Sequence, residues 1–254
     1  MSSTNANTNG VPNGTNGISP KIILYTNHGC PFAHRAHIAL KELGLPYEEV
    51  IIDLDKPREP WYLEINPRGL VPSIKYSNGI LSDEVITESA IVAQFLADSF
   101  PSHLLPASHS SPTAALTRAR IAFFTDTWNT KVQSYMYPIF KAEGAEKEEQ
   151  VDACVAAIEK EIEPLLAEAK PFFGGSEKLT LAEAIVAPFL LRFYACSNGD
   201  LMPKSFKERM QKLPNFGKWA DQVLSQESVL YIWDEEKVIS RTTQRIAKMK
   251  QAAK

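Results

Sequence analysis

One cysteine stands where the sequence changes from a strand pattern to a helix pattern. The apolar run 22–25 predicts a strand, the turn 27–29 follows, and apolar residues then recur at helical spacing from Cys30-Pro31 to residue 43. Proline suits the first position of a helix, because no N–H is needed there. The free N–H groups that follow and the helix dipole favour an anion, so the pattern predicts a reactive thiolate at Cys30.

The position three residues beyond Cys30 is Ala33, so there is no C-x-x-C pair. Without a second local thiol, a mixed disulfide at Cys30 must be resolved by an external thiol. Cys154 and Cys196 stand in apolar helical contexts and are predicted to fill the core. The competing interpretation is that Cys30 itself is only a small buried residue at a turn.

A metal site is an alternative use of the same helix. Cys30, His34 and His37 fall at positions i, i+4 and i+7, with His28 nearby. This face lies opposite the apolar one and also carries Lys41. We therefore expect solvated histidines there and no metal ion.

Composition and charge limit the class of protein. The 254 residues are 44% hydrophobic and 22% charged, as in a globular protein with an ample core. A net charge of -3 gives no attraction for nucleic acid or an anionic membrane, and no apolar run is long enough to span a bilayer. Three cysteines without disulfide spacing and a start without a secretory signal predict a cytoplasmic location.

The chain divides into five segments by composition. Residues 1–20 are polar and are expected to be disordered, 21–100 alternate strand and helix patterns, 101–112 form a Pro- and Ser-rich linker, 113–233 are helical, and 234–254 form a polar helical tail.

The segment 21–100 predicts the order β-α-β-α-β-β-α. After the first strand and helix come a strand at 47–54, a short helix near 61–65, and two short strands, 70–76 and 79–83, joined by a hairpin at Ser77-Asn78-Gly79. A helix over 87–100 closes this segment. Val71-Pro72, just before the hairpin, is a candidate cis bond.

The helical segment has one strong start signal. Thr180-Leu181-Ala182-Glu183 is a capping box, and the helix it opens is almost wholly apolar apart from Arg192. This helix should be the buried centre of the segment, with a kink at Pro188.

Taken together, these features resemble a cytosolic glutathione transferase, with a thioredoxin-like α/β domain followed by an all-α domain. The sequences C-P-F-A-x-R at 30–35, N-P-x-G-L-V-P at 66–72 and E-S-A-I at 88–91 are similar to the omega class in particular. These motifs, in this order and spacing, carry the resemblance, which covers about residues 21–233.

The resemblance implies a role for each matching residue. Cys30 corresponds to the catalytic cysteine, which forms a mixed disulfide with glutathione, and Phe32 to a residue packed beside the tripeptide. Val71, before Pro72, corresponds to the position whose backbone pairs with the cysteinyl part of glutathione.

The two ends of glutathione have their own predicted contacts. Glu88 and Ser89 match the pair that holds the γ-glutamyl end, although a plain helix cap is the alternative for Ser89. Arg58 aligns with a family lysine that contacts the glycyl carboxylate, and Lys56 is an alternative to it.

A substrate pocket is also implied by the resemblance. Trp219 lies where the family has a tryptophan in the electrophile pocket. Tyr135 and Phe189 are expected to join it against an apolar substrate, with core packing as the alternative for these two.

The expected activity is omega-type, glutathione-dependent thiol transfer, including deglutathionylation and dehydroascorbate reduction. The alternatives are conjugation or isomerisation of a specialised metabolite at the same glutathione site, and a non-catalytic regulatory protein on this fold. The resemblance also implies a homodimer whose partners are glutathione and a small electrophilic or disulfide substrate.

Overall fold

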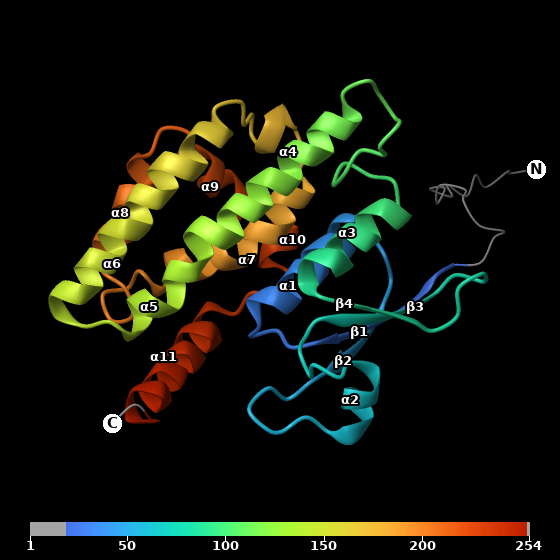
Figure 1. The fold of residues 1–254 in the computed structure, drawn as a ribbon, viewed down its shortest axis with the longest axis horizontal. Coiled ribbons are helices and arrows are strands. Elements are labelled where there is room, and N and C mark those ends of the chain that lie inside the picture. The colour runs from blue at the N-terminus through green and yellow to red at the C-terminus, as the bar shows by residue number, and fades with distance from the viewer. Residues whose placement is uncertain (1–18, 253–254) are drawn as a thin grey trace, which may run out of the picture.

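The structure is a computed structural model that describes residues 19–252. Disorder was expected for residues 1–20, and residues 1–18 of that segment lie outside the described residues. The chain forms a small α/β part followed by a larger helical part (Figure 1). The fold class expected from the sequence is confirmed.

A four-stranded sheet forms the centre of the α/β part, in the order β2-β1-β3-β4. The strands are β1 (Lys21–Thr26), β2 (Glu48–Ile51), β3 (Ser73–Ser77) and β4 (Glu84–Thr87). β1 and β2 are parallel, whereas β1 with β3 and β3 with β4 are antiparallel. A parallel pair needs a crossover, and here the crossover is α1 (Pro31–Glu42).

The hairpin differs from its predicted form. No strand forms at 79–83, because the Asn78 side chain accepts hydrogen bonds from the N–H groups of Ile80 and Leu81 at 3.1 and 2.8 Å. These bonds hold the chain in a wide turn, and Gly79 supplies its positive φ of 87°. Pairing therefore resumes only at Glu84, in β4.

Helices cover both faces of the sheet (Figure 1). Side chains alternate along β1, so Ile22 and Leu24 belong to the main core, while Tyr25 belongs to a smaller cluster on the other face. α1 and α3 (Ser89–Ser99) pack side by side on the first face. α2 (Pro60–Ile65) contributes Tyr62 to the second cluster.

The helical part contains eight further α-helices within the described residues. They are α4 (Ala114–Thr127), α5 (Met136–Lys141), α6 (Gly144–Ala157), α7 (Leu181–Cys196), α8 (Lys204–Lys212), α9 (Phe216–Leu224), α10 (Glu227–Leu230) and α11 (Glu235–Ala252). π-helical turns at Trp128–Val132 and Ile158–Ile162 interrupt the two long helical stripes, and 3₁₀ turns lie at Gln133–Tyr135, Glu163–Leu166 and Phe173–Gly175.

α7 is the buried centre of this part, as its sequence predicts. The Thr180 hydroxyl accepts a hydrogen bond from the Ala182 N–H at 3.2 Å, and the Glu183 carboxylate accepts one from the Thr180 N–H at 2.9 Å, which confirms the capping box. α7 also packs against α1, so one hydrophobic core continues from the α/β part into the helical part.

α11 starts near the α/β part and runs away from it to the C-terminus at the lower left of Figure 1. It packs against α5 and α7, and Arg241 pairs with Asp55 in the loop after β2 at 2.5 Å. Within residues 19–252, no helix has the length and apolar character needed to cross a membrane.

Candidate active site

Cys30 occupies the N-cap position of α1 with extended backbone angles. Its N–H donates to the Asn27 carbonyl at 2.9 Å, and the Asn27 side chain accepts from the Gly29 N–H and donates to the Ile52 carbonyl. The turn is thereby tied to the segment that follows β2. Cys30 is half-buried at the end of α1 where the first backbone N–H groups have no acceptor within the helix.

The Val71-Pro72 segment lies beside this cysteine. The bond is cis, which confirms the prediction, and the Val71 carbonyl oxygen lies 4.0 Å from the Cys30 sulfur. The preceding loop is fixed through the Leu70 carbonyl, which accepts from the Asn66 amide at 2.8 Å and the Tyr62 hydroxyl at 2.5 Å. The backbone of Val71 is therefore held close to the sulfur.

Arg35, on α1, is buried and donates hydrogen bonds to four acceptors. Its guanidinium donates to the Ile185 carbonyl at 2.8 Å and to the Ser89 hydroxyl at 3.1 Å. It also donates to the side chains of Asn129 at 2.8 Å and Gln133 at 3.1 Å. Arg35 thus fixes Ser89 relative to α7 and to the π-helical turn that follows α4.

Arg192 approaches the same turn from α7. Its guanidinium donates to the Gly29 carbonyl at 3.1 Å and to the Pro188 carbonyl at 2.7 Å. The guanidinium carbon also lies 5.2 Å from the centre of the Trp233 ring. Arg192 therefore links the helical part to the residue just before Cys30.

Both arginines interact electrostatically with the cysteine. Burial lowers the pKa of Arg35 to about 9 and that of Arg192 to about 10, while attraction to the charge on Cys30 opposes both shifts. Among the described residues, no carboxylate forms an ion pair with either guanidinium. Both guanidinium groups are therefore held by backbone and neutral side-chain acceptors.

An aromatic pair stands beside this charged region. Phe32 is 40% exposed, and its ring centre lies 5.1 Å from that of the buried Phe189. The guanidinium of Arg35 lies 4.7 Å from the centre of the Phe189 ring. Phe32 belongs to α1 and Phe189 to α7, so this ring contact joins the two parts of the molecule.

Glu88 and Ser89 stand at the start of α3. The N-cap position belongs to Glu88, so Ser89 is not a plain helix cap, and its buried hydroxyl accepts from Arg35 instead. Glu88 has a φ of 67°, which is uncommon for a residue with a side chain. Residues held in such conformations cluster at functional sites. Its half-exposed carboxylate pairs with Arg68 at 2.5 Å.

Arg58 holds the loop after β2 through hydrogen bonds to backbone carbonyls. Its guanidinium donates to the backbone carbonyls of Gly69, Asp53, Lys56 and, at 3.5 Å, Leu54. These bonds occupy the donors that a glycyl carboxylate would need. Lys56 forms an ion pair with Asp53 at 3.2 Å, and its side chain is exposed.

Two expected pocket residues lie in the helical part. Tyr135 is half-buried against the main core. Trp219 is 1% exposed, and its indole N–H donates to the Glu183 carboxylate at 2.8 Å. The structure does not bring Trp219 to the surface beside Cys30, because the buried carboxylate at the start of α7 needs this donor.

The histidines of α1 are not solvated as expected. His34 is 1% exposed and His37 fully buried, because α7 and α10 pack against α1. His37 hydrogen-bonds to the Thr26 hydroxyl at 2.9 Å and to the Tyr47 hydroxyl at 3.0 Å. It therefore does not share a solvent-exposed face with Cys30.

Sequence reasoning missed four residues of this site, namely Arg35, Asn129, Gln133 and Arg192. A single charge within an apolar helix was the available signal for Arg192, since such a residue must find buried partners. Asn129 and Gln133 had no signal, because their role depends on Arg35, which is 94 and 98 residues away.

Two protein-family models match this chain. The model of the N-terminal domain of glutathione S-transferases matches residues 29–99, and that of the C-terminal domain matches residues 141–222. This chain belongs to the glutathione transferase family. Its α/β part and its helical part correspond to the two family domains.

Similar proteins carry omega-class names, as the sequence motifs predict. Glutathione transferase Omega 1C from Trametes versicolor is 30% identical with a TM-score of 0.75, covering 89% of this chain and 97% of the other. Rat glutathione S-transferase omega-1 is 27% identical over 69% of this chain and 68% of its own length. Glutathione S-transferase DHAR2 from Arabidopsis thaliana is 28% identical over 74% of this chain and 78% of its own length.

Proposed function

We propose that this glutathione transferase uses Cys30 for omega-type thiol transfer. The supporting observation is the place of its sulfur, which lies at the start of α1, half-buried and 4.0 Å from the Val71 carbonyl oxygen. It also interacts electrostatically with the buried Arg35 and Arg192, neither of which forms an ion pair with a carboxylate of the described residues. The start of a helix favours an anion, and the thiolate is the nucleophilic form of cysteine.

Glutathione is the proposed co-substrate, bound along the same edge of the α/β part. Val71 offers its backbone to the cysteinyl part, next to Pro72, and Phe32 packs beside the tripeptide. The Glu88 carboxylate receives the α-ammonium group, and Ser89 with the first N–H groups of α3 receives the α-carboxylate. Lys56 is the freer of the two candidates for the glycyl carboxylate, because the donors of Arg58 are already used.

The reaction proceeds in two exchanges. The Cys30 thiolate attacks the glutathione sulfur of a glutathionylated substrate, so that the Cys30–glutathione disulfide forms and the substrate leaves as a thiolate. A second glutathione thiolate then attacks the glutathione sulfur of this mixed disulfide. Oxidised glutathione leaves, and Cys30 returns to the thiolate.

The experiment is intact-mass measurement after incubation with oxidised glutathione. We expect one glutathione adduct, removed by excess reduced glutathione, and none in Cys30→Ser. Cys154→Ser is the matched control and should keep the adduct, because burial raises the pKa of Cys154 to about 12 and keeps its thiol protonated. An unmodified wild-type chain, or an adduct that persists in Cys30→Ser, would refute the mechanism.

Conjugation or isomerisation of an apolar metabolite is the second candidate. The exposed Phe32, two residues after Cys30 and backed by the buried Phe189, favours it, because an exposed aromatic ring can pack against an apolar substrate. Conjugation through bound glutathione thiolate should survive Cys30→Ala, whereas thiol transfer should be lost. A chain that fails to bind immobilised glutathione would instead be a non-catalytic protein on this fold.

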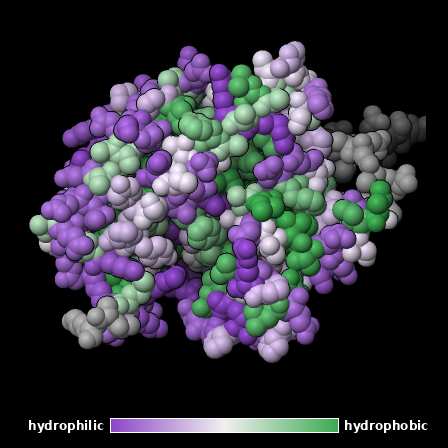
Figure 2. Space-filling model, in the orientation of Figure 1, coloured by the Kyte–Doolittle hydropathy of each residue, from purple (hydrophilic) through white to green (hydrophobic). Residues whose placement is uncertain are grey.

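A homodimer is part of the proposal. Large apolar side chains are 40 to 60% exposed on β4, α3 and α4, namely Val85, Ile91, Leu116 and Phe123. α3 and α4 are neighbours, joined by the Asp98 and Arg118 pair, and Figure 2 shows green side chains gathered over this face. Exposed apolar surface of this kind is typical of a protein interface.

A further inference from the structure

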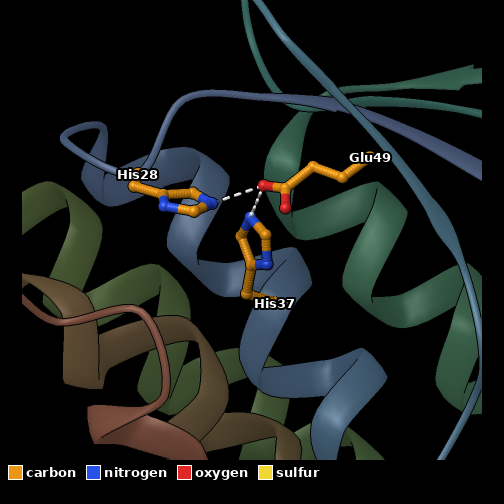
Figure 3. Close-up of side chains that lie close together, drawn as sticks. All are labelled: His28, His37 and Glu49. Atoms are coloured by element: carbon orange, nitrogen blue, oxygen red, sulfur yellow. Dashed lines mark hydrogen bonds and ion pairs between the residues drawn. The ribbon is translucent and has the colours of Figure 1, made fainter.

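Three potential metal ligands converge on the side of the sheet next to the active-site turn (Figure 3). His28 lies in the turn before Cys30, His37 lies on α1, and Glu49 lies on the edge strand β2. One ligand atom from each lies within 4.8 Å of the other two. No other group of this kind occurs among residues 19–252.

The side chains are aimed at one another. Nε2 of His28 contacts Oε1 of Glu49, and Nε2 of His37 lies 3.7 Å from the same oxygen. The two imidazole rings meet edge to face, with 5.3 Å between their centres. Because the three donors come from a turn, a helix and a strand, the fold itself brings them together.

We propose that His28, His37 and Glu49 form a binding site for a divalent transition metal ion, with zinc as the best match. Two imidazole nitrogens and one carboxylate oxygen suit zinc, and three protein ligands leave a fourth position for water. Donors bound tetrahedrally at about 2.0–2.2 Å lie roughly 3.3 Å apart. The present spacing needs only a small adjustment, which the partly exposed side chains of His28 and Glu49 allow.

The surroundings of His37 favour the tautomer that zinc requires. The Tyr47 hydroxyl lies 3.0 Å from Nδ1, where it can accept the ring proton and leave Nε2 free to bind. Zinc would replace the 2.9 Å hydrogen bond between Nε2 and the Thr26 hydroxyl. We therefore expect an exchangeable ion, not a permanent structural one.

The proposed site is separate from the thiol chemistry. Cys30 and His34, which share a helical face with His37 in the sequence, are not in the ligand set. A bound ion would tie the turn that holds Cys30 to β2 and α1. Metal binding itself can be measured without glutathione, so its failure would not affect the proposed transferase mechanism.

The test measures metal binding to the full chain without an affinity tag. Cys30→Ser is the background, so that the thiol cannot bind the ion. Zinc stoichiometry is measured by equilibrium dialysis, and cobalt is used as a second probe because its visible absorption strengthens when it is four-coordinate. Glu49→Gln and His28→Asn each remove one ligand at a partly exposed position.

His103→Gln is the matched control. His103 pairs with Glu42 at 2.7 Å, in a His–Glu contact without a third ligand. We expect one zinc ion per chain in the background protein and in His103→Gln, with affinity at least about tenfold weaker in both ligand variants. The proposal is overturned if no stoichiometric zinc binds at a tenfold excess, or if both ligand variants bind it as well as the background does.

Discussion

Arg35 joins α1, the helix that follows Cys30, to the helical part through geometry as well as charge. Its planar guanidinium reaches Ser89, Asn129 and Gln133, and one carbonyl of α7. A lysine would keep the charge but could not satisfy acceptors spread around the plane. Each acceptor left without a donor in this buried place would cost free energy.

Arg35→Lys should therefore lower the free energy of unfolding by about 2–4 kcal/mol. Arg68→Lys is the control, because the Arg68 side chain is 69% exposed and forms a surface ion pair with Glu88. We expect a change within about 0.5 kcal/mol there. Urea unfolding curves at neutral pH measure both, and equal changes in the two variants would contradict the assigned role of Arg35.

His34 gives the molecule a dependence on pH. Burial holds its pKa well below the ordinary value of 6.5, with a further lowering by Arg192. The unfolded chain therefore binds a proton below pH 6.5 that the folded chain does not. Stability from this group is complete above pH 6.5 and decreases as the pH falls below it.

His34→Phe should remove this part of the pH dependence. Between pH 6.5 and 5, the wild-type protein should lose up to about 1.4 kcal/mol of unfolding free energy per pH unit more than the variant. Urea unfolding at pH 7, 6 and 5 measures the difference. Parallel curves for the two proteins would show that His34 is not the titrating group.

At the scale of elements, α7 is the buried helix around which the helical part packs. The fully buried Glu183 carboxylate at its start accepts hydrogen bonds from the backbone N–H groups of Phe173 and Thr180. It also accepts from the Thr180 hydroxyl and the Trp219 indole. One carboxylate thus fixes the start of α7 relative to α9 and to the turn before α7.

Glu183→Gln should be strongly destabilising although it is nearly isosteric. The amide nitrogen would replace an oxygen that accepts hydrogen bonds, so a donor would face other donors, at a cost of about 2–4 kcal/mol. Glu146→Gln, in the exposed first turn of α6, should change stability little. Thermal unfolding compares the two, and a similarly small change in both would exclude a central role for Glu183.

At the scale of the whole molecule, the site exists only where the two parts meet. α1 packs against α3 on one side and against α7 on another, and the core is continuous across them. Cys30, Val71 and Ser89 come from the α/β part, whereas Phe189 and Arg192 come from the helical part. The α/β part alone would lack the cation that Arg192 brings to the turn before Cys30.

The proposed dimer can be tested on the exposed face of α4. Phe123→Glu places a charge in the apolar interface and should convert the dimer to a monomer, as measured by light scattering after size-exclusion chromatography. Ile51→Glu is the control, because Ile51 is 56% exposed on β2, at the opposite edge of the sheet from β4. A wild-type monomer, or a dimer that persists in Phe123→Glu, would contradict the proposal.

The sequence alone determined the local features of this protein. The cysteine at a helix start, the cis Val71-Pro72 bond and the Thr180 capping box were predictable, because each depends on neighbouring residues or on a resembling motif. The β-α-β-α-β-β-α order was also predictable, although the last strand was misplaced where Asn78 bonds to the backbone.

The tertiary structure decided which polar side chains meet. Arg35 bonds to the Ile185 carbonyl 150 residues away, Arg192 reaches Gly29 across 163 residues, and His28 contacts Glu49 only because β2 pairs in parallel with β1. Hydrogen bonds and charge interactions act over a few ångströms in space, and sequence spacing does not record such distances between remote segments. Packing of α1 against α7 therefore set the electrostatics around Cys30.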